Sequence, residues 1–217
     1  MNESKPDPPL PLLAAICIAL LFGGIAIGVA LGGVMPLPYG PVGAIEQYVR
    51  AQPTAIQVIA VAVFASSVPL AAYAATASAR LRELGAAATA TIALTGGVVA
   101  AGALGLTGLL AWTLSRPGVR GDAALVSALY YLVFLVGGAG HIVAVGLLVG
   151  GISISGQLSR PLARAGLAIA GLCELTTLVL VWPVLGPILP VARVSALVWL
   201  VVAGARLPVR RNGIRPD

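Results

Sequence analysis

The chain has 217 residues, of which 59% are hydrophobic and only 9% are charged. A soluble domain usually carries about 25% charged residues, so this composition excludes an ordinary water-soluble fold and predicts that much apolar surface faces lipid. The formal net charge of +6 does not indicate nucleic-acid binding. The arginines lie in short links between apolar runs, where they act as topology signals, and not in a basic stripe with exposed aromatic residues.

The first apolar run covers residues 10–35 and follows a polar, proline-rich segment, MNESKPDPP, which we expect to be a disordered tail over 1–9. The run has ~25 apolar residues, more than the ~7–15 of a signal peptide, so it predicts an uncleaved first span. Gly24, Gly28 and Gly32 recur at every fourth position, and such a face admits a second helix closely in lipid. The face forms either a homodimer contact or a contact with another span of the same chain, and the sequence leaves both open.

The link after this run, PVGAIEQYVRAQP, predicts a short helix lying flat in the membrane interface. At helical spacing Val42, Ile45 and Val49 share one face, whereas Glu46 and Arg50 lie on the opposite face.

Five more apolar runs follow, separated by short links that contain arginine, glycine and proline. We therefore predict an all-α fold, a polytopic transmembrane helical bundle with a single domain over 10–209 and a basic tail over 210–217. The predicted spans are 10–35, 54–78, 85–114, 123–151, 165–183 and 188–209.

Orientation is predicted from the lysines and arginines of the links, because the side richer in them is usually cytoplasmic. One side holds Lys5, Arg80, Arg82, Arg160, Arg164, Arg206, Arg210, Arg211 and Arg215. The other side holds Arg50, Arg116, Arg120 and Arg193. We therefore expect both termini in the cytoplasm, and we expect Arg193, near the start of the sixth span, to extend to the outer interface.

Two ionisable residues lie deep in the predicted spans, His141 in the fourth and Glu174 in the fifth. Each lies nine or ten residues from the cytoplasmic end of its span, or roughly 15 Å, which is near the midplane. Consecutive spans usually pack together, so the sequence permits a contact between the two side chains. Such a pair serves either as a proton relay or ligand anchor, or as a structural clasp between helices.

Gly137, Gly138 and Gly140 immediately precede His141. This stretch predicts tight helix packing, a bend, or room for a ligand. It does not predict a nucleotide-binding loop, because no strand precedes it and it lies in mid-membrane.

The spans contain no arrangement typical of an enzyme. No Ser-His-Asp set lies at membrane depth, the sequence has no HExxH motif, and its single histidine excludes a haem held by two histidines of one chain. We therefore expect no catalytic residues, no metal site and no cofactor. The expected partners are the lipid bilayer, a small-molecule ligand of unknown identity and, where the glycine face is external, a second copy of the chain.

The fourth-span stretch LVFLVGGAGHIVAVGLLVGGISI, together with the six-span layout and the chain length, resembles a family of uncharacterised actinobacterial integral membrane proteins of unknown function. The resemblance implies a location in the bacterial plasma membrane. It carries no catalytic or binding residues across to this chain.

Overall fold

The structure, a computed structural model, describes residues 9–41 and 43–208. All regular elements in these two segments are helical, and six helices are long and apolar enough to cross a membrane. This confirms the predicted all-α bundle of six spans. The elements are α1 (Leu10–Gly32), α2 (Ala44–Ala51), α3 (Pro53–Glu83), α4 (Ala87–Leu114), α5 (Pro117–Arg120), α6 (Ala123–Leu135), η1 (Val136–Gly140), α7 (His141–Ser153), α8 (Arg160–Leu175), η2 (Thr176–Leu180), η3 (Pro183–Leu185) and α9 (Ile188–Arg206).

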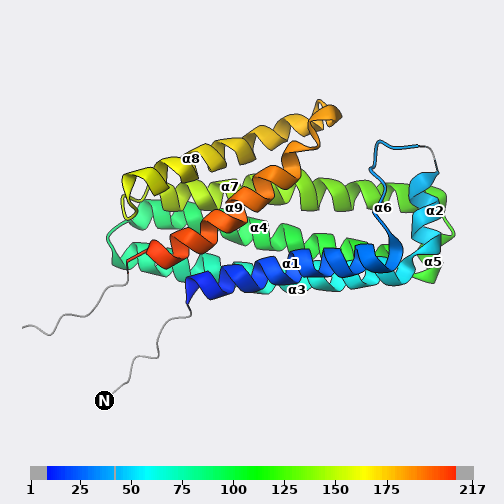
Figure 1. Ribbon diagram of the computed structural model, residues 1–217, viewed down its shortest axis with the longest axis horizontal. Helices are drawn as coiled ribbons and strands as arrows, with labels where there is room; N and C mark the ends of the chain where they lie inside the picture. Colours follow the sequence, from blue (N-terminus) through cyan, green and yellow to red (C-terminus); the bar gives the residue numbers. More distant parts are fainter. Residues whose placement is uncertain (1–8, 42, 209–217) are drawn as a thin grey trace, which may run out of the picture.

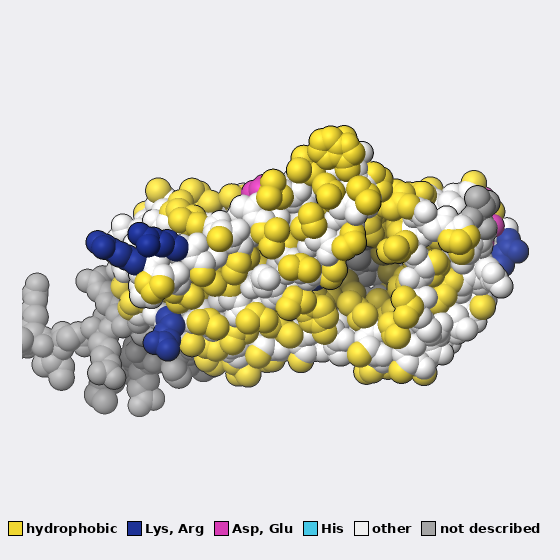
Figure 2. All heavy atoms as spheres, turned by 45° about the horizontal axis from the view of Figure 1, so that its top comes forward, with side chains coloured by type: hydrophobic (Ala, Val, Ile, Leu, Met, Phe, Trp, Pro, Cys, Tyr) yellow, Lys and Arg dark blue, Asp and Glu magenta, His cyan; other side chains and the backbone are white. Residues whose placement is uncertain are grey.

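The long helices run side by side, and α1 and α9 bring both ends of the described chain to one end of the bundle, called here the termini end (Figure 1). The short helix α2 lies across the opposite end, called the α2 end. Hydrophobic side chains cover the length of the face shown in Figure 2, and arginine side chains gather towards its two ends. An apolar belt between two charged ends is the surface that a bilayer requires.

The helix predicted in the first link is confirmed as α2, which begins at Ala44. Val49 is buried and Ile45 packs beside it, in a small apolar cluster with residues of α3, α4 and α6, whereas Arg50 is exposed. Val42, the third residue of the predicted apolar face, lies outside the described residues.

The second span is longer than the predicted 54–78 and continues to Glu83. The arginines that marked a link in the sequence belong to its last turns. The helix ends where Gly85 adopts a left-handed φ of 83° and the Ala86 N–H bonds back to the Leu81 carbonyl. Glycine enters this conformation without a Cβ penalty, so it ends the helix and the arginines do not.

The predicted glycine face of the first span packs inside the molecule, against α3. A Cβ atom added at Gly24 or Gly28 would overlap Ala62 or Ile59 respectively, and one at Gly32 would lie 2.6 Å from the Ala55 Cβ. Of the two roles left open by the sequence, the internal contact is the one that the structure shows.

The last two spans form a hairpin, α8–η2–η3–α9, that is inclined to the other helices and stops short of the α2 end (Figure 1). The fifth helix loses its α-helical form at Leu175 and continues as a 3-10 turn to Leu180. Its tip therefore lies beside the middle of the bundle, and the half of the bundle nearer α2 is built from α1, α3, α4 and α6.

Candidate functional site: a buried arginine and histidine at a π-helical break

The fourth span, Ala123–Ser153, is interrupted near its middle by the π-helical segment η1. The His141 N–H bonds to the carbonyl of Val136, five residues back, so the Gly137 carbonyl is not taken up by the usual α-helical partner. Single π turns inside α-helices occur frequently at functional sites. The side chains around this break are therefore candidates for a functional site.

Glycines let neighbouring helices approach the break. A Cβ atom at Gly137 would lie 2.7 Å from Cγ2 of Thr107 on α4, and one at Gly138 would lie 3.5 Å from Leu189 on α9. The tight packing predicted for this stretch is thus present at Gly137, whereas Gly140 is exposed. A larger residue at position 137 would displace α4.

His141 begins α7 directly after the break and is completely buried. Its Nδ1 lies 3.1 Å from the carbonyl oxygen of Ala100 on α4. A carbonyl can only accept, so we assign the ring hydrogen to Nδ1. The other ring nitrogen, Nε2, is buried and has no hydrogen-bond partner among the described residues. A buried polar atom without a partner is costly, so its presence here requires an explanation.

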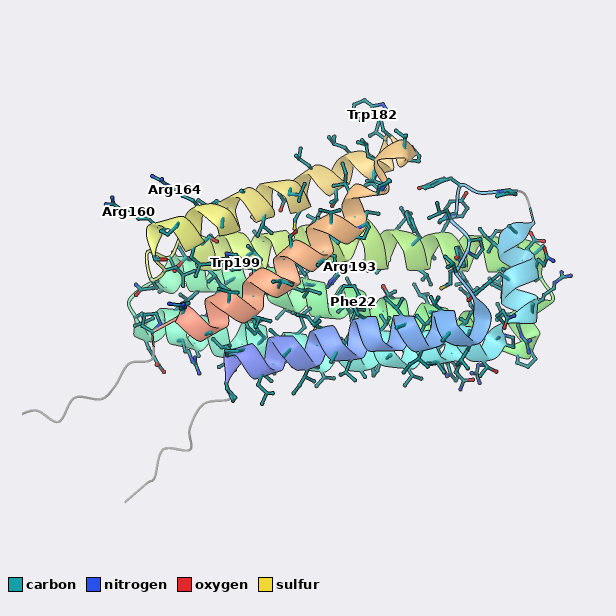
Figure 3. All side chains as sticks on the ribbon, viewed as in Figure 1. Phe22, Arg160, Arg164, Trp182, Arg193 and Trp199 are labelled. Carbon is teal, nitrogen blue, oxygen red and sulfur yellow. The ribbon has the colours of Figure 1, made fainter. Side chains whose placement is uncertain are left out.

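Arg193 lies in the middle of the bundle, which corrects the prediction that it extends to the outer interface. Figure 3 shows it reaching from α9 into the bundle, and its Nη2 donates a hydrogen bond to the Gly137 carbonyl of the π-helical break. The prediction failed because it assumed that the sixth span crosses the full bundle. The α8–α9 hairpin is short, so a residue near the start of α9 is at mid-depth.

Arg193 has unused donors at this depth. Its Nε is buried without a hydrogen-bond partner among the described residues, and the side chain as a whole is only part-buried. The carbonyl that Arg193 binds belongs to Gly137, four residues before His141 in the same helical span. The two side chains therefore place one permanent cation and one unpaired imidazole nitrogen around the same turn of the fourth span.

The structure does not bring His141 and Glu174 together. His141 faces α4, whereas Glu174 is exposed on α8, with its Oε1 3.4 Å from where a Cβ of Gly146 would lie. Gly146 is five residues beyond His141, which places the two positions about 140° apart around the helix. Similar depth in adjacent spans was therefore insufficient to predict a contact, because His141 and Glu174 lie on different sides of α7.

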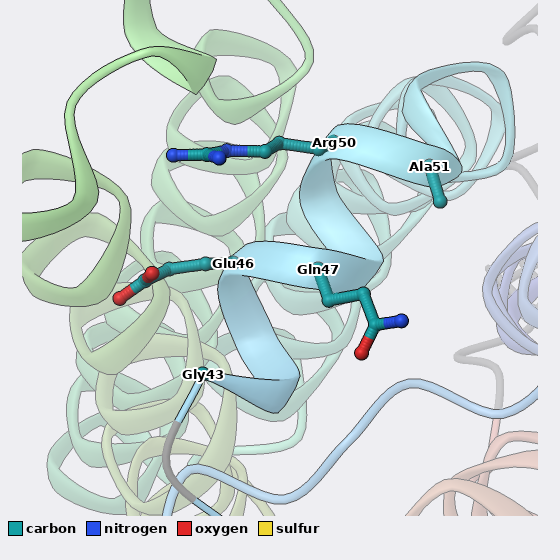
Figure 4. A pocket seen from close by; sticks show the side chains of 5 residues that line it. All are labelled: Gly43, Glu46, Gln47, Arg50 and Ala51. Atoms are coloured by element: carbon teal, nitrogen blue, oxygen red, sulfur yellow. The ribbon is translucent and has the colours of Figure 1, made fainter.

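An open hollow lies at the surface of the α2 end, lined by Gly43, Glu46, Gln47, Arg50 and Ala51. Figure 4 shows Glu46 and Arg50 pointing to the same side of α2. The Nε of Arg50 donates to the carbonyl of Arg120 at 3.3 Å, and this bond fastens α2 to the neighbouring turn α5. The polar side chain of Arg50 at this hollow therefore has a structural role, which is to attach α2 to α5.

The His141–Arg193 arrangement has the chemistry of a receptor for a negatively charged or acidic group. Arginine donates in a planar fork to carboxylate or phosphate, and the unprotonated Nε2 of His141 accepts one hydrogen bond from an acidic group. Comparison with known proteins adds no assignment, because no family model, curated protein or solved structure matches the chain.

Proposed function

We propose that this membrane protein binds a small anionic ligand in mid-membrane, at Arg193 and His141, and acts as a small permease or a ligand-binding protein and not as an enzyme. The observation that carries the proposal is the Arg193 guanidinium, which lies in the middle of the bundle with a backbone carbonyl as its hydrogen-bond partner. Ionisable side chains at such depth are expensive to keep, and they mark ligand or ion sites by default.

The charge of Arg193 supports an anion as the ligand. A carbonyl dipole offsets only part of the cost of burying a full charge, and no ion pair neutralises Arg193 within residues 9–41 and 43–208. A bound anion would supply the missing charge, and Nε supplies an unused donor for it. The exposed Glu174 on α8 does not serve as this counter-charge.

Location in a plasma membrane with both termini in the cytoplasm is part of the proposal. Because Arg193 lies at mid-depth, it no longer counts for either side. The described arginines at the termini end are Arg80, Arg82, Arg160, Arg164 and Arg206, and those at the α2 end are Arg50, Arg116 and Arg120. The surplus at the termini end supports a cytoplasmic position for that end.

Thermal unfolding of the full chain in zwitterionic nanodiscs tests the binding site. The protein would be titrated with chloride, acetate, dodecanoate and inorganic phosphate. We expect one or more of these anions to raise the melting temperature of the wild type and not that of Arg193→Gln. A ligand at a hundred times its Kd adds about 2.7 kcal/mol.

Arg164→Gln is the matched control, because it removes an exposed arginine of α8 and should leave the response intact. Indifference of the wild type to all four anions, or an equal response in Arg193→Gln, would contradict the proposed site.

A second candidate function is assembly with another copy of the chain, and the exposed position of Glu174 favours it. A carboxyl group on a lipid-facing side of α8 lacks polar solvent, and a partner helix would cover it. Light scattering in mild detergent tests this candidate. A dimer that dissociates in Glu174→Leu, but not in the control Leu178→Ala, would support assembly. A monomeric wild type would exclude it.

A further inference from the structure

The bundle is hollowed on one side at the depth of Arg193. Figure 2 shows this hollow in an otherwise apolar face, between the tip of the α8–α9 hairpin and the α2 end. Of the other helices, α1 packs mainly on α3, and α6 packs mainly on α4. On the hollowed side of the bundle, α9 is the helix that packs beside α1, and it begins only at mid-depth.

The hollow combines an apolar wall with a cation at its inner edge. In Figure 3 Arg193 points from the start of α9 into the bundle, on the side of α1 where Phe22 lies. Arg193 is half-buried as a whole residue, and its Nε atom is buried. Because the surrounding surface is apolar and at membrane depth, the hollow opens towards lipid tails and not towards water.

This geometry constrains the ligand. A short, fully hydrated anion would have to leave water and cross hydrocarbon to reach Arg193, at a large desolvation cost. An amphiphile already dissolved in the bilayer keeps its chain in an apolar surrounding throughout and brings only its head to the cation. A carboxylate head suits Arg193, because its oxygens accept charge-assisted hydrogen bonds from the guanidinium.

We propose that the ligand is a single-chain anionic amphiphile, a long-chain carboxylate. Its head binds at Arg193 beside His141, and its chain lies in the hollow between α1, α6 and α9. The inference rests on the proposed anion site and adds the chemical class of the ligand and its route of entry, laterally from the bilayer.

Binding would be measured on the full chain in zwitterionic nanodiscs, by native mass spectrometry and thermal unfolding. The probes are dodecanoate, acetate and the neutral alcohol dodecanol. We expect one dodecanoate per chain, bound at least about tenfold more tightly than acetate or dodecanol. Arg193→Gln should weaken dodecanoate binding by about tenfold or more, because a hydrogen bond to a charged group is lost. Arg164→Gln should bind as the wild type does.

The alternative outcomes separate the two proposals. If acetate binds as tightly as dodecanoate and needs Arg193, the long-chain inference is overturned and the anion site stands. If dodecanol binds as tightly as dodecanoate, the hollow takes chains without regard to charge and the inference is overturned. If no probe binds in a manner that depends on Arg193, the long-chain inference fails. If phosphate and chloride also fail to stabilise the wild type, the proposed anion site fails as well.

Discussion

Arg193 of the sixth span donates a hydrogen bond to the carbonyl oxygen of Gly137, in the π-helical break of the fourth span. Two irregular features are joined by this bond. The break turns one carbonyl away from its α-helical partner, and the short α8–α9 hairpin brings a cation to mid-depth. Each feature is unfavourable in a membrane by itself, and together they satisfy one donor and one acceptor while other donors of Arg193 stay open.

Replacing Arg193 with leucine should stabilise the unliganded protein. The change removes a charge whose desolvation is only partly offset, and apolar replacement of buried charged groups is often stabilising by about 1–4 kcal/mol. The melting temperature in zwitterionic nanodiscs should therefore rise, with the anion response lost. A clear fall in melting temperature would show instead that Arg193 is a structural brace between α9 and the fourth span.

Gly28→Leu should destabilise the protein by about 1–3 kcal/mol, because the new side chain overlaps Ile59 and forces α1 away from α3. Gly23→Leu is the matched control on the same helix, since a Cβ there has nothing within 4 Å. Thermal unfolding and light scattering would be measured on both variants. Equal stability of the two, or a change of assembly size in Gly28→Leu without loss of stability, would place the glycine face on the outside.

Changes at His141 and Glu174 should be additive. The two side chains face different neighbours, so a double-mutant cycle of His141→Leu and Glu174→Leu should give a coupling below about 0.5 kcal/mol. His141→Leu should be the more destabilising single change, because it leaves the buried Ala100 carbonyl without this hydrogen bond. Coupling of more than about 1 kcal/mol would restore the His141–Glu174 pair as a functional unit.

Much of the fold follows from the sequence, for reasons visible in particular residues. Long apolar runs and arginine-bearing links were sufficient for the six spans, and the spacing of Ile45 and Val49 was sufficient for α2. These patterns are local. The same local reasoning placed the end of the second span too early, because the residue that ends the helix is Gly85 and not the first arginine.

The candidate site was only half accessible to sequence reasoning. His141 was identified by its depth, but its facing helix depends on rotation about the fourth span, which a π-helical break shifts. Arg193 was missed because its depth depends on the tilt and length of the α8–α9 hairpin, a tertiary property. The available signal was an arginine inside an apolar run whose start is marked by Gly186 and Pro187, a segment too irregular to begin a full span.

Orientation is testable with reporters active only in the cytoplasm. A reporter fused after Arg211 and one inserted at the exposed turn residue Gly156 should both be active, because Gly156 and the last turn of α9 lie at the termini end. An insertion at the exposed Gly118, at the α2 end, should be silent. Activity at Gly118 together with silence at Gly156 would invert the topology.

The contact between Arg193 and Gly137 is the central claim, and solid-state NMR in lipid tests it most directly. The protein would be labelled with 15N-arginine and with glycine carrying 13C at the carbonyl carbon. We predict a through-space correlation between a guanidinium nitrogen and a glycine carbonyl that is present in the wild type and absent in Arg193→Gln. A wild-type spectrum without this correlation, with the Arg193 nitrogens exchanging freely with water, would place the side chain at the interface and contradict the account.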